Sequence, residues 1–119
     1  MDKVLESIVN GLINKTNAGQ VKWLKAETPN GYKVLLDKGI ITIQPFRVNG
    51  SDYTEFIVTN NRGDVLLRES ARNSTTDGIL LHNLYYAAFN SYTGREDVIK
   101  SLLEAINSDD EIGDPDLPF

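Results

Sequence analysis

The chain has 119 residues, no cysteine and a formal net charge of −5. Its length is typical of one domain with its own core, and the lack of cysteine excludes disulfides and thiol chemistry and fits a reducing cytoplasm. No apolar run approaches the roughly 18 residues that span a membrane, and the first residues lack the pattern of a signal peptide, so we expect a cytoplasmic protein without a membrane partner.

The chain opens on residues spaced as in an amphipathic helix. Asp2 is a suitable N-cap, and Asn17-Ala18-Gly19 is a typical helix end. We expect the whole apolar stripe of this helix to lie in the core. Its members are Val4, Leu5, Ile8, Val9, Leu12 and Ile13.

Residues 21–69 have the pattern of about five antiparallel strands joined by short turns. The expected strands are residues 21–26, 32–36, 40–44, 53–59 and 65–69, and Pro29-Asn30-Gly31 and Asn49-Gly50 are strong turn signals between them. Pro45 follows the third strand and cannot donate a backbone hydrogen bond, which indicates an edge or a bulge. The order of strands and turns predicts a meander sheet.

Two helices are expected after the sheet. Thr76 or Asp77 caps the first, whose apolar stripe runs from Leu80 to Tyr92. Thr93-Gly94-Arg95-Glu96 has the sequence of a capping box for the second. We expect the second helix to bury Val98, Ile99, Leu102, Leu103 and Ile106. The sum is a single α+β domain over residues 1–106, with helices covering one face of a meander sheet.

The net negative charge is confined to the end of the chain. Residues 107–119 carry five acidic side chains and no basic one, whereas residues 1–106 carry twelve of each. The body is therefore neutral, and we expect residues 107–119 to form a separate, disordered acidic tail. A tail that only aids solubility has no need of Leu117 and Phe119, which are poor residues for that purpose.

The tail ends in Asp116-Leu117-Pro118-Phe119. From average residue usage, a given chain end reads Asp-aliphatic-Pro-Phe with a probability on the order of 10⁻⁵. An acidic run with this ending resembles the C-terminal tip of bacterial single-stranded DNA-binding proteins (SSB), which docks onto replication, recombination and repair proteins. The resemblance implies partners of the RecO-, RecQ- or PriA-like kind in a bacterial host cell. The residues that it implicates are Asp109, Asp110, Glu111, Asp114, Asp116, Leu117, Pro118 and Phe119.

The chemistry of the tip suits a docking peptide. Phe119 offers an aromatic ring and a terminal carboxylate on one residue, so a partner needs only an apolar pocket with a basic rim. Pro118 fixes its own φ angle and holds Leu117 extended, which reduces the entropy lost on docking. The acidic residues steer the tail toward basic surfaces, an effect that salt weakens.

The resemblance covers about a tenth of the chain and is confined to the tip motif. SSB proteins carry an OB-fold barrel and a long linker rich in Gly, Pro and Gln before the tip. This chain has instead the pattern of helices flanking a meander, without such a linker. The resemblance therefore carries over the docking function and not the binding of single-stranded DNA. Unrelated folds carry the same tip, phage-encoded DNA-binding proteins among them, so a phage origin is open.

Nucleic-acid binding by the sheet rests on the body's own residues. Single strands are held by aromatic platforms and basic side chains on a sheet. Residues 20–73 contain eight basic and six acidic residues, and charge and ring alternate around Trp23. Trp23 fits a core position equally well, and alternate lysines also protect a sheet edge. The candidate DNA-binding set is Lys22, Trp23, Lys25, Tyr32, Lys33, Arg47, Tyr53 and Arg62.

Catalysis is not expected. The chain has one histidine, His82, and no cysteine with which it could form a nucleophile or a zinc site. No phosphate-binding loop or calcium loop is present, so we expect neither an enzyme nor a cofactor or metal.

The sequence predicts a non-enzymatic protein of DNA metabolism. In this reading it is SSB-like: the body binds single-stranded DNA and the tip recruits partner proteins. Two alternatives stay open. One is a tip mimic, a decoy or adaptor that binds tip-binding proteins without binding DNA. The other is a small inhibitor or immunity-type interaction protein with an incidental acidic tail.

Overall fold

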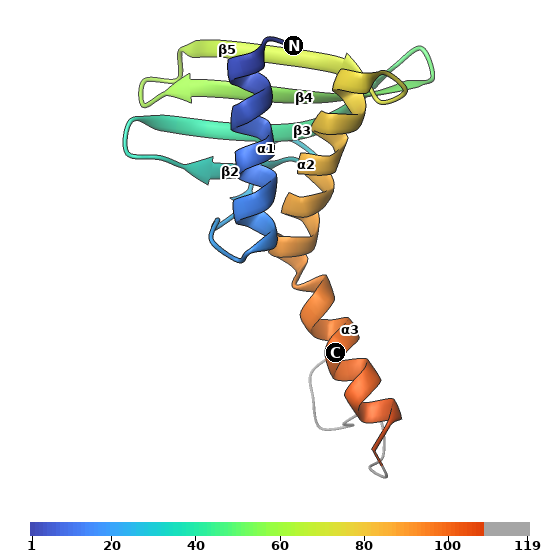
Figure 1. The fold of residues 1–119 in the computed structure, drawn as a ribbon. Coiled ribbons are helices and arrows are strands. Elements are labelled where there is room, and N and C mark those ends of the chain that lie inside the picture. Colours follow the sequence, from blue (N-terminus) through green and yellow to red (C-terminus); the bar gives the residue numbers. More distant parts are fainter. Residues whose placement is uncertain (109–119) are drawn as a thin grey trace.

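The computed structural model describes residues 1–108, so the whole predicted docking tip, from Asp109 to Phe119, lies outside the described residues. Within residues 1–108 the chain forms one helix, five strands and two further helices, in the order that the sequence predicts. Figure 1 shows α1 and α2 on one face of the sheet and α3 pointing away from it. The predicted α+β class is confirmed.

Helix α1 (Lys3–Asn17) begins where the sequence predicts it. The side chain of Asp2 accepts a hydrogen bond from the backbone N–H of Leu5 at 2.7 Å, which caps the first turn. Leu5 and Val9 are buried, whereas Val4 and Ile8 are 71% and 43% exposed. The expectation that the whole stripe lies in the core is therefore wrong, because the stripe is wider than the side of α1 that meets α2 and the sheet.

Five antiparallel strands form one open sheet in chain order. They are β1 (Leu24–Lys25), β2 (Tyr32–Leu35), β3 (Gly39–Val48), β4 (Ser51–Asn60) and β5 (Val65–Arg72). Because β1 and β5 lie at opposite edges, the sheet is a meander and does not close into an OB-type barrel. The β3–β4 pairing closes around Asn49 and Gly50, whose φ angles of 51° and 80° suit a two-residue hairpin turn.

Pro45 lies inside β3 rather than after it. Strand β2 stops pairing with β3 at Ile43, whereas β4 pairs along all of β3 and places Thr54 opposite Pro45. Pro45 therefore lies where one side of β3 has no neighbouring strand to receive a hydrogen bond. The predicted edge is confirmed locally, although β3 as a whole is an inner strand.

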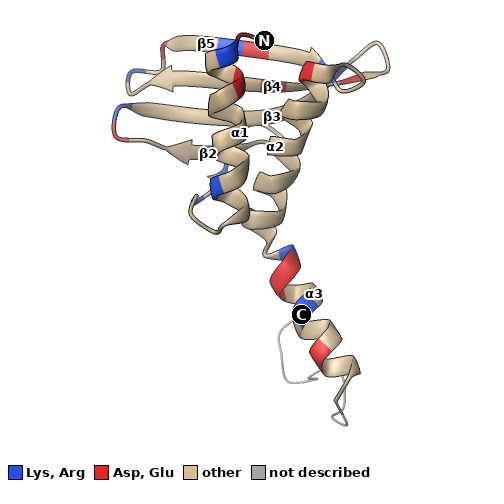
Figure 2. Ribbon diagram, in the orientation of Figure 1, with Lys and Arg blue, Asp and Glu red and all other residues tan. Residues whose placement is uncertain are grey.

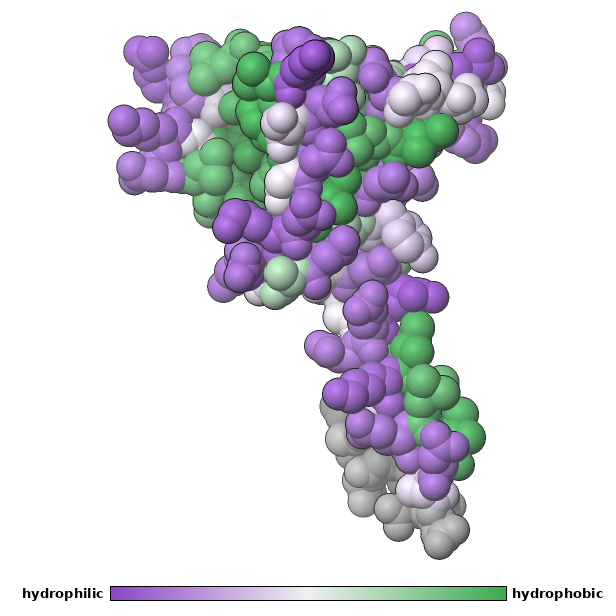
Figure 3. Space-filling view, viewed as in Figure 1, coloured by the Kyte–Doolittle hydropathy of each residue, from purple (hydrophilic) through white to green (hydrophobic). Residues whose placement is uncertain are grey.

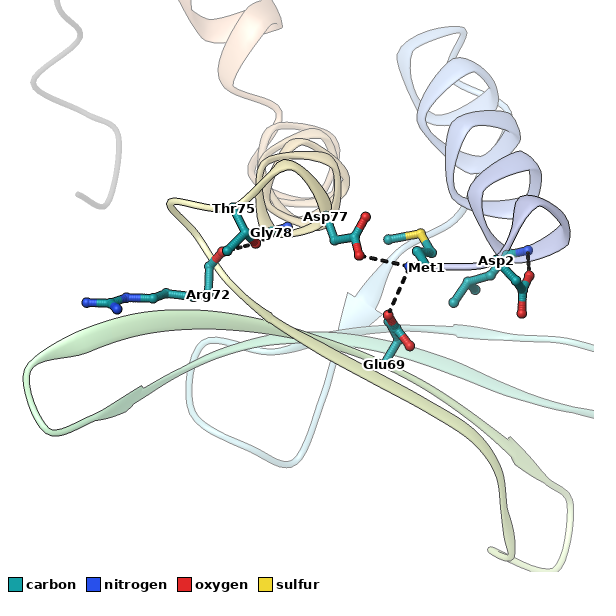
Figure 4. Close-up of polar contacts among 8 residues, drawn as sticks. Met1, Asp2, Glu69, Arg72, Thr75, Asp77 and Gly78 are labelled. Carbon is teal, nitrogen blue, oxygen red and sulfur yellow. Dashed lines mark hydrogen bonds and ion pairs between the residues drawn. The ribbon is translucent and has the colours of Figure 1, made fainter.

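Helix α2 (Thr76–Thr93) has Thr75 as its N-cap, one residue before the predicted caps. The Thr75 hydroxyl accepts a hydrogen bond from the backbone N–H of Gly78 at 3.1 Å (Figure 4). A Cβ added at Gly78 would overlap the carbonyl oxygen of Arg72, at the end of β5. The first turn of α2 therefore lies directly on the backbone that leaves the sheet.

The core lies between α1, α2 and one face of the sheet. At one end of it, Tyr32 contacts the rings of Tyr85, Phe89 and Tyr92, with centroid distances of 5.7, 6.4 and 5.3 Å. The buried cluster consists of Leu5, Val9, Trp23, Tyr32, Val34, Ile41, Ile43, Phe56, Leu81, Leu84 and Ala88.

Helix α3 (Arg95–Ile106) differs most from the prediction. It follows Gly94, which has a left-handed φ of 65°, and no side chain caps its first turn. The predicted capping box does not form, because the Thr93 hydroxyl donates instead to the carbonyl of Phe89 at 2.7 Å. None of the residues of α3 is buried.

The predicted buried face of α3 is consequently wrong. Its apolar residues lie 39–64% exposed along a helix that leaves the body at the end of α2 (Figures 1 and 3). They are Val98, Ile99, Leu102, Leu103 and Ile106. Among residues 1–108, no helix is long and apolar enough to cross a membrane.

Candidate nucleic-acid interface

Helices α1 and α2 cover one face of the sheet, and no described helix covers the other (Figures 1 and 4). Side chains alternate between the two faces along each strand, so one row of known direction fixes the rest. Ile43 and Phe56 are opposite each other and both 0% exposed, so their row faces the helices. The next row, Gln44 with Glu55, faces the other way. We call that side the open face.

Phe46 and Tyr53 form a stacked pair on the open face. They are opposite each other in the β3–β4 register, with ring centroids 5.1 Å apart and ring planes inclined by 12°. The turn at Asn49-Gly50 determines this register, since a two-residue hairpin fixes which residues face each other. Both residues are half-buried, so the pair is not fully covered. Aromatic surface of this kind supports the stacking of a nucleobase.

Strand β5 adds two exposed arginines beside these rows. Arg72 pairs with Tyr53 in the sheet register, and Arg68 pairs with Ile57. The Arg72 guanidinium donates to Ser51 Oγ at 2.7 Å, which holds it near the aromatic pair. A guanidinium suits both phosphate and aromatic contacts. The row from Phe46 through Tyr53 to Arg72 therefore combines rings with a cation across three strands.

A polar network crosses the middle of the open face. Glu55 is 7% exposed, and its two carboxylate oxygens accept hydrogen bonds from Gln44 Nε2 at 3.1 Å and from Ser70 Oγ at 2.6 Å. Arg68 lies 3.7 Å from the same carboxylate, and Thr28 Oγ1 donates to Gln44 Oε1 at 2.6 Å. These contacts compensate a carboxylate that would otherwise be costly to bury.

Two aromatic members of the predicted DNA-binding set belong to the core. Trp23 is 4% exposed, and its Nε1–H donates to Thr16 Oγ1 at 3.0 Å. Tyr32 is also 4% exposed, and burial raises the pKa of its hydroxyl above the ordinary value. Neither ring has a face that a base could reach, so their prediction as a stacking platform is wrong. The contacts with α1 and α2 hold both rings inside.

The predicted cations are spread around the molecule (Figure 2). Arg47 forms an ion pair with Asp52 at 2.9 Å and lowers the pKa of that carboxyl, and Arg62 lies 3.7 Å from Asp64 in the β4–β5 turn. Lys25 Nζ lies 4.9 Å from the Tyr32 ring centroid, on the helix side of the sheet.

Only two members of the predicted set lie on the open face. Lys33 pairs with Thr42 in the register and forms an ion pair with Glu27, whose pKa the lysine lowers, and Tyr53 stacks on Phe46. Lys22 precedes β1 beside a hollow of about 660 Å³ that Trp23 and Tyr92 also line. The structure therefore does not bring the predicted set together.

The open face also contains residues outside the predicted set. They are Gln44, Phe46, Arg68, Ser70 and Arg72. The signal that identifies them is strand alternation counted from the Asn49-Gly50 turn, which pairs Phe46 with Tyr53. Adjacency in the sequence predicts a different set, because neighbours in a strand point to opposite faces.

A separate polar cavity of about 300 Å³ lies where the ends of α1 and α2 meet the start of α3. Asn17, Asn90, Glu96 and Asp97 are among the residues that line it. The Oδ1 atom of Asn90 is buried without a hydrogen-bond partner among the described residues. Within residues 1–108, no three His, Cys, Asp or Glu side chains gather where they could hold a metal ion.

Comparison of the chain with family models, with curated proteins and with solved structures gave no match. Its function therefore has to be argued from its own residues and geometry.

Proposed function

We propose that this protein binds single-stranded DNA on the open face of its sheet and recruits replication, recombination and repair proteins through its C-terminal tip. The stacked pair of Phe46 and Tyr53, with Arg72 beside it, is the observation that carries the DNA-binding part. Stacking of a base on an aromatic side chain is worth about 1–3 kcal/mol, and it tolerates every base. The proposed binding is therefore general for single strands rather than sequence-specific.

The arrangement of the open face supports this mode of binding. A base stacked on the rings of Phe46 and Tyr53 would have its phosphate within reach of the Arg72 guanidinium, since Arg72 and Tyr53 are direct neighbours in the sheet. Glu55 opposes phosphate binding by its charge. Its hydrogen bonds with Gln44 and Ser70, and the proximity of Arg68, reduce that repulsion.

The recruiting part of the proposal rests on the sequence of the tip. Asp116, Leu117, Pro118 and Phe119 match the SSB tip residue by residue. A docking peptide tethered to a DNA-binding body raises the local concentration of its partner at single-stranded DNA. In one chain, the DNA-binding body would bring the tip to single-stranded DNA, and the tip would bring partner proteins to the bound body.

A second candidate, the tip mimic that binds no DNA, is favoured by the charge of the body. Residues 1–106 are neutral, and four basic side chains of the sheet region lie in ion pairs: Lys33, Arg47, Arg62 and Arg68. Nucleic-acid affinity depends largely on cations that neutralise phosphates. A body with few available cations suits a decoy or adaptor of tip-binding proteins.

Fluorescence anisotropy of a labelled oligo-dT, titrated with the full chain at two salt concentrations, separates the candidates. We expect saturable binding that weakens as salt rises. No binding at either salt, together with binding of a tip-reading partner that depends on Phe119, would replace the proposal with the tip mimic. If neither DNA nor such a partner binds, the inhibitor or immunity-type reading takes over.

A further inference from the structure

Helix α3 presents an apolar stripe with no cover from the described residues. Five aliphatic side chains lie on one side of it, with exposed fractions between 39% and 64%. They are Val98, Ile99, Leu102, Leu103 and Ile106. Together they expose roughly 400 Å² of apolar surface, which is comparable to the largest apolar patch on a typical monomeric protein, a patch that is often functional. Figure 3 shows the stripe as a continuous band along the projecting helix.

The helix is too short to be stable by itself. It has 12 residues and buries none of them. Isolated helices of about this length are marginal in water, because most helical stability in proteins comes from packing of the apolar face. A partner on the stripe would supply the missing packing.

We infer that a second copy of this chain docks on this stripe, α3 against α3. The stripe spans roughly 140° of the helix circumference, wider than a narrow coiled-coil seam and typical of a packed helix bundle. Between Val98 and Ile106 it contains only aliphatic side chains, whereas the contact centres of interfaces between different proteins are enriched in Trp, Tyr and Arg. A self-complementary stripe of this kind fits an identical stripe.

The charges on α3 leave the stripe free for such a contact. Glu96, Lys100 and Glu104 are four residues apart along the helix; Lys100 and Glu104 lie opposite Leu102, and Glu96 lies at the edge of the stripe beside Leu103. Their spacing pairs opposite charges along each helix. Arg95 lies on the same line as Leu102 and Ile106, but it precedes Val98 at the start of the helix, so no charge has to be buried where two segments from Val98 to Ile106 meet.

The acidic tail determines the direction of the pairing. A parallel pair would bring two tails of five acidic side chains each to the same end, whereas an antiparallel pair separates them by the helix length, roughly 18 Å. Packed helices lie about 8–10 Å apart, so a parallel pair would also force the two bodies against each other. We therefore assign the antiparallel arrangement, with Leu102 near its centre and Val98 of one chain beside Ile106 of the other.

The area of the contact indicates a weak association between the two copies. Two stripes of this area bury roughly 800 Å², which is below the range of stable interfaces and belongs to weak, concentration-dependent association. Sedimentation of the full chain, from low to high micromolar concentration, should show a rise from the monomer mass of 13.3 kDa toward twice that value. A mass that stays at 13.3 kDa across the range would overturn the inference.

A matched pair of variants tests whether the stripe is the contact. Leu102→Glu places a charge in the stripe and should weaken self-association about ten-fold or more, whereas Ser101→Glu adds the same charge outside the stripe and should not. Trp23 fluorescence checks the body in both variants, since Trp23 lies in the core and α3 contributes nothing to that core. Equal weakening by both variants would exclude a contact through the stripe.

Cross-linking tests the direction and does not depend on destabilising the helix. The chain has no cysteine, so Val98→Cys and Ile106→Cys each introduce a single thiol. When the two variants are mixed and oxidised, the antiparallel pair predicts the mixed disulfide in excess over either homodimer, because only that pair brings the two Cα atoms within disulfide reach. Predominance of the two homodimers would show a parallel pair and contradict the assigned arrangement.

Discussion

The α-amino group of Met1 lies 2.9 Å from a carboxylate oxygen of Asp77 and 3.9 Å from one of Glu69 (Figure 4). These contacts join the start of α1 to the first turn of α2 and to β5. The hydrogen bond to Asp77 is the main cause that raises the pKa of the amino group above its ordinary value of 8.0. The Met1 ammonium therefore links the start of α1 to α2 and to β5.

The stability of the protein should consequently fall as pH rises above 8. A group whose pKa is raised by folding contributes its full stabilisation below its unfolded value, here 8.0, and loses it as pH rises through the higher folded value. Urea unfolding between pH 7 and pH 10 checks this, with the native amino terminus left without an added tag.

Asp77→Asn is the control for this effect. It removes the carboxylate that raises the pKa while all other titrating groups stay in place, so the difference in stability between the two proteins should shrink as pH rises. A difference that stays constant from pH 7 to pH 10 would mean that the ammonium–carboxylate contact does not contribute.

Substitution of Gly78 should destabilise the fold. A Cβ at this position would overlap the carbonyl oxygen of Arg72, so the start of α2 would have to move away from β5. We expect Gly78→Ala to lower the free energy of unfolding by about 1–3 kcal/mol, the usual cost of overpacking.

Gly11 in α1 offers the matched control, because a Cβ there meets nothing within 4 Å. Gly11→Ala should leave the stability unchanged or raise it by about 0.5–1 kcal/mol through better helix propensity. Thermal unfolding of both variants is the measurement, and equal effects of the two substitutions would rule out the close approach at Gly78 as the cause.

Local sequence signals account for much of this fold. The Asp2 cap and the Asn49-Gly50 hairpin follow from rules that involve only neighbouring residues, and both are present. Periodicity also gives the residues that share a face of α3. It does not say whether another element packs on that face, and here none of the described residues does. The predicted burial of α3 failed for this reason.

The candidate interface depended on contacts that local signals do not contain. Trp23 lies between two lysines in the sequence, but its indole N–H finds the hydroxyl of Thr16 on α1, which makes it a core residue. Conversely, Phe46 and Arg72 are far apart in the sequence and both flank Tyr53 in the sheet. A register for the whole meander was needed to bring them together.

Removal of the aromatic ring from Tyr53 should weaken the proposed DNA binding. Tyr53→Leu keeps an apolar side chain over the sheet but removes the stacking surface, so we expect a loss of affinity for oligo-dT of about ten-fold, the effect of one lost base stack. Tyr86→Leu is the control, since Tyr86 is 48% exposed on α2, on the other side of the sheet. Anisotropy titrations with oligo-dT measure the affinity of both variants. Equal losses of affinity would contradict DNA binding on the open face.

Arg72, beside the rings of Phe46 and Tyr53, should contribute to the salt dependence of the proposed DNA binding. For a single strand, each neutralised phosphate contributes about −0.7 to the slope of log K against log salt. Arg72→Gln should therefore make the slope shallower by about that amount. Arg47→Gln removes the same charge from β3 on the helix-covered side, where Asp52 already compensates it, and should leave the slope unchanged. The prediction is wrong if both variants change the slope alike.

Deletion of Phe119 should abolish partner docking and leave the body unaffected. In the proposed docking, the aromatic ring and the terminal carboxylate of this residue enter the tip pocket, and removal shifts the carboxylate to Pro118, which has no aromatic ring to insert. Direct titration with a recombination mediator or a RecQ-type helicase should show loss of binding. Thermal unfolding should be unchanged, because the buried core residues that the structure describes all lie between Leu5 and Ala88. Unchanged partner affinity in the deletion variant would refute the docking role of the tip. Binding of oligo-dT by the same variant should stay as it is in the full chain, because the proposed DNA-binding face lies in the body.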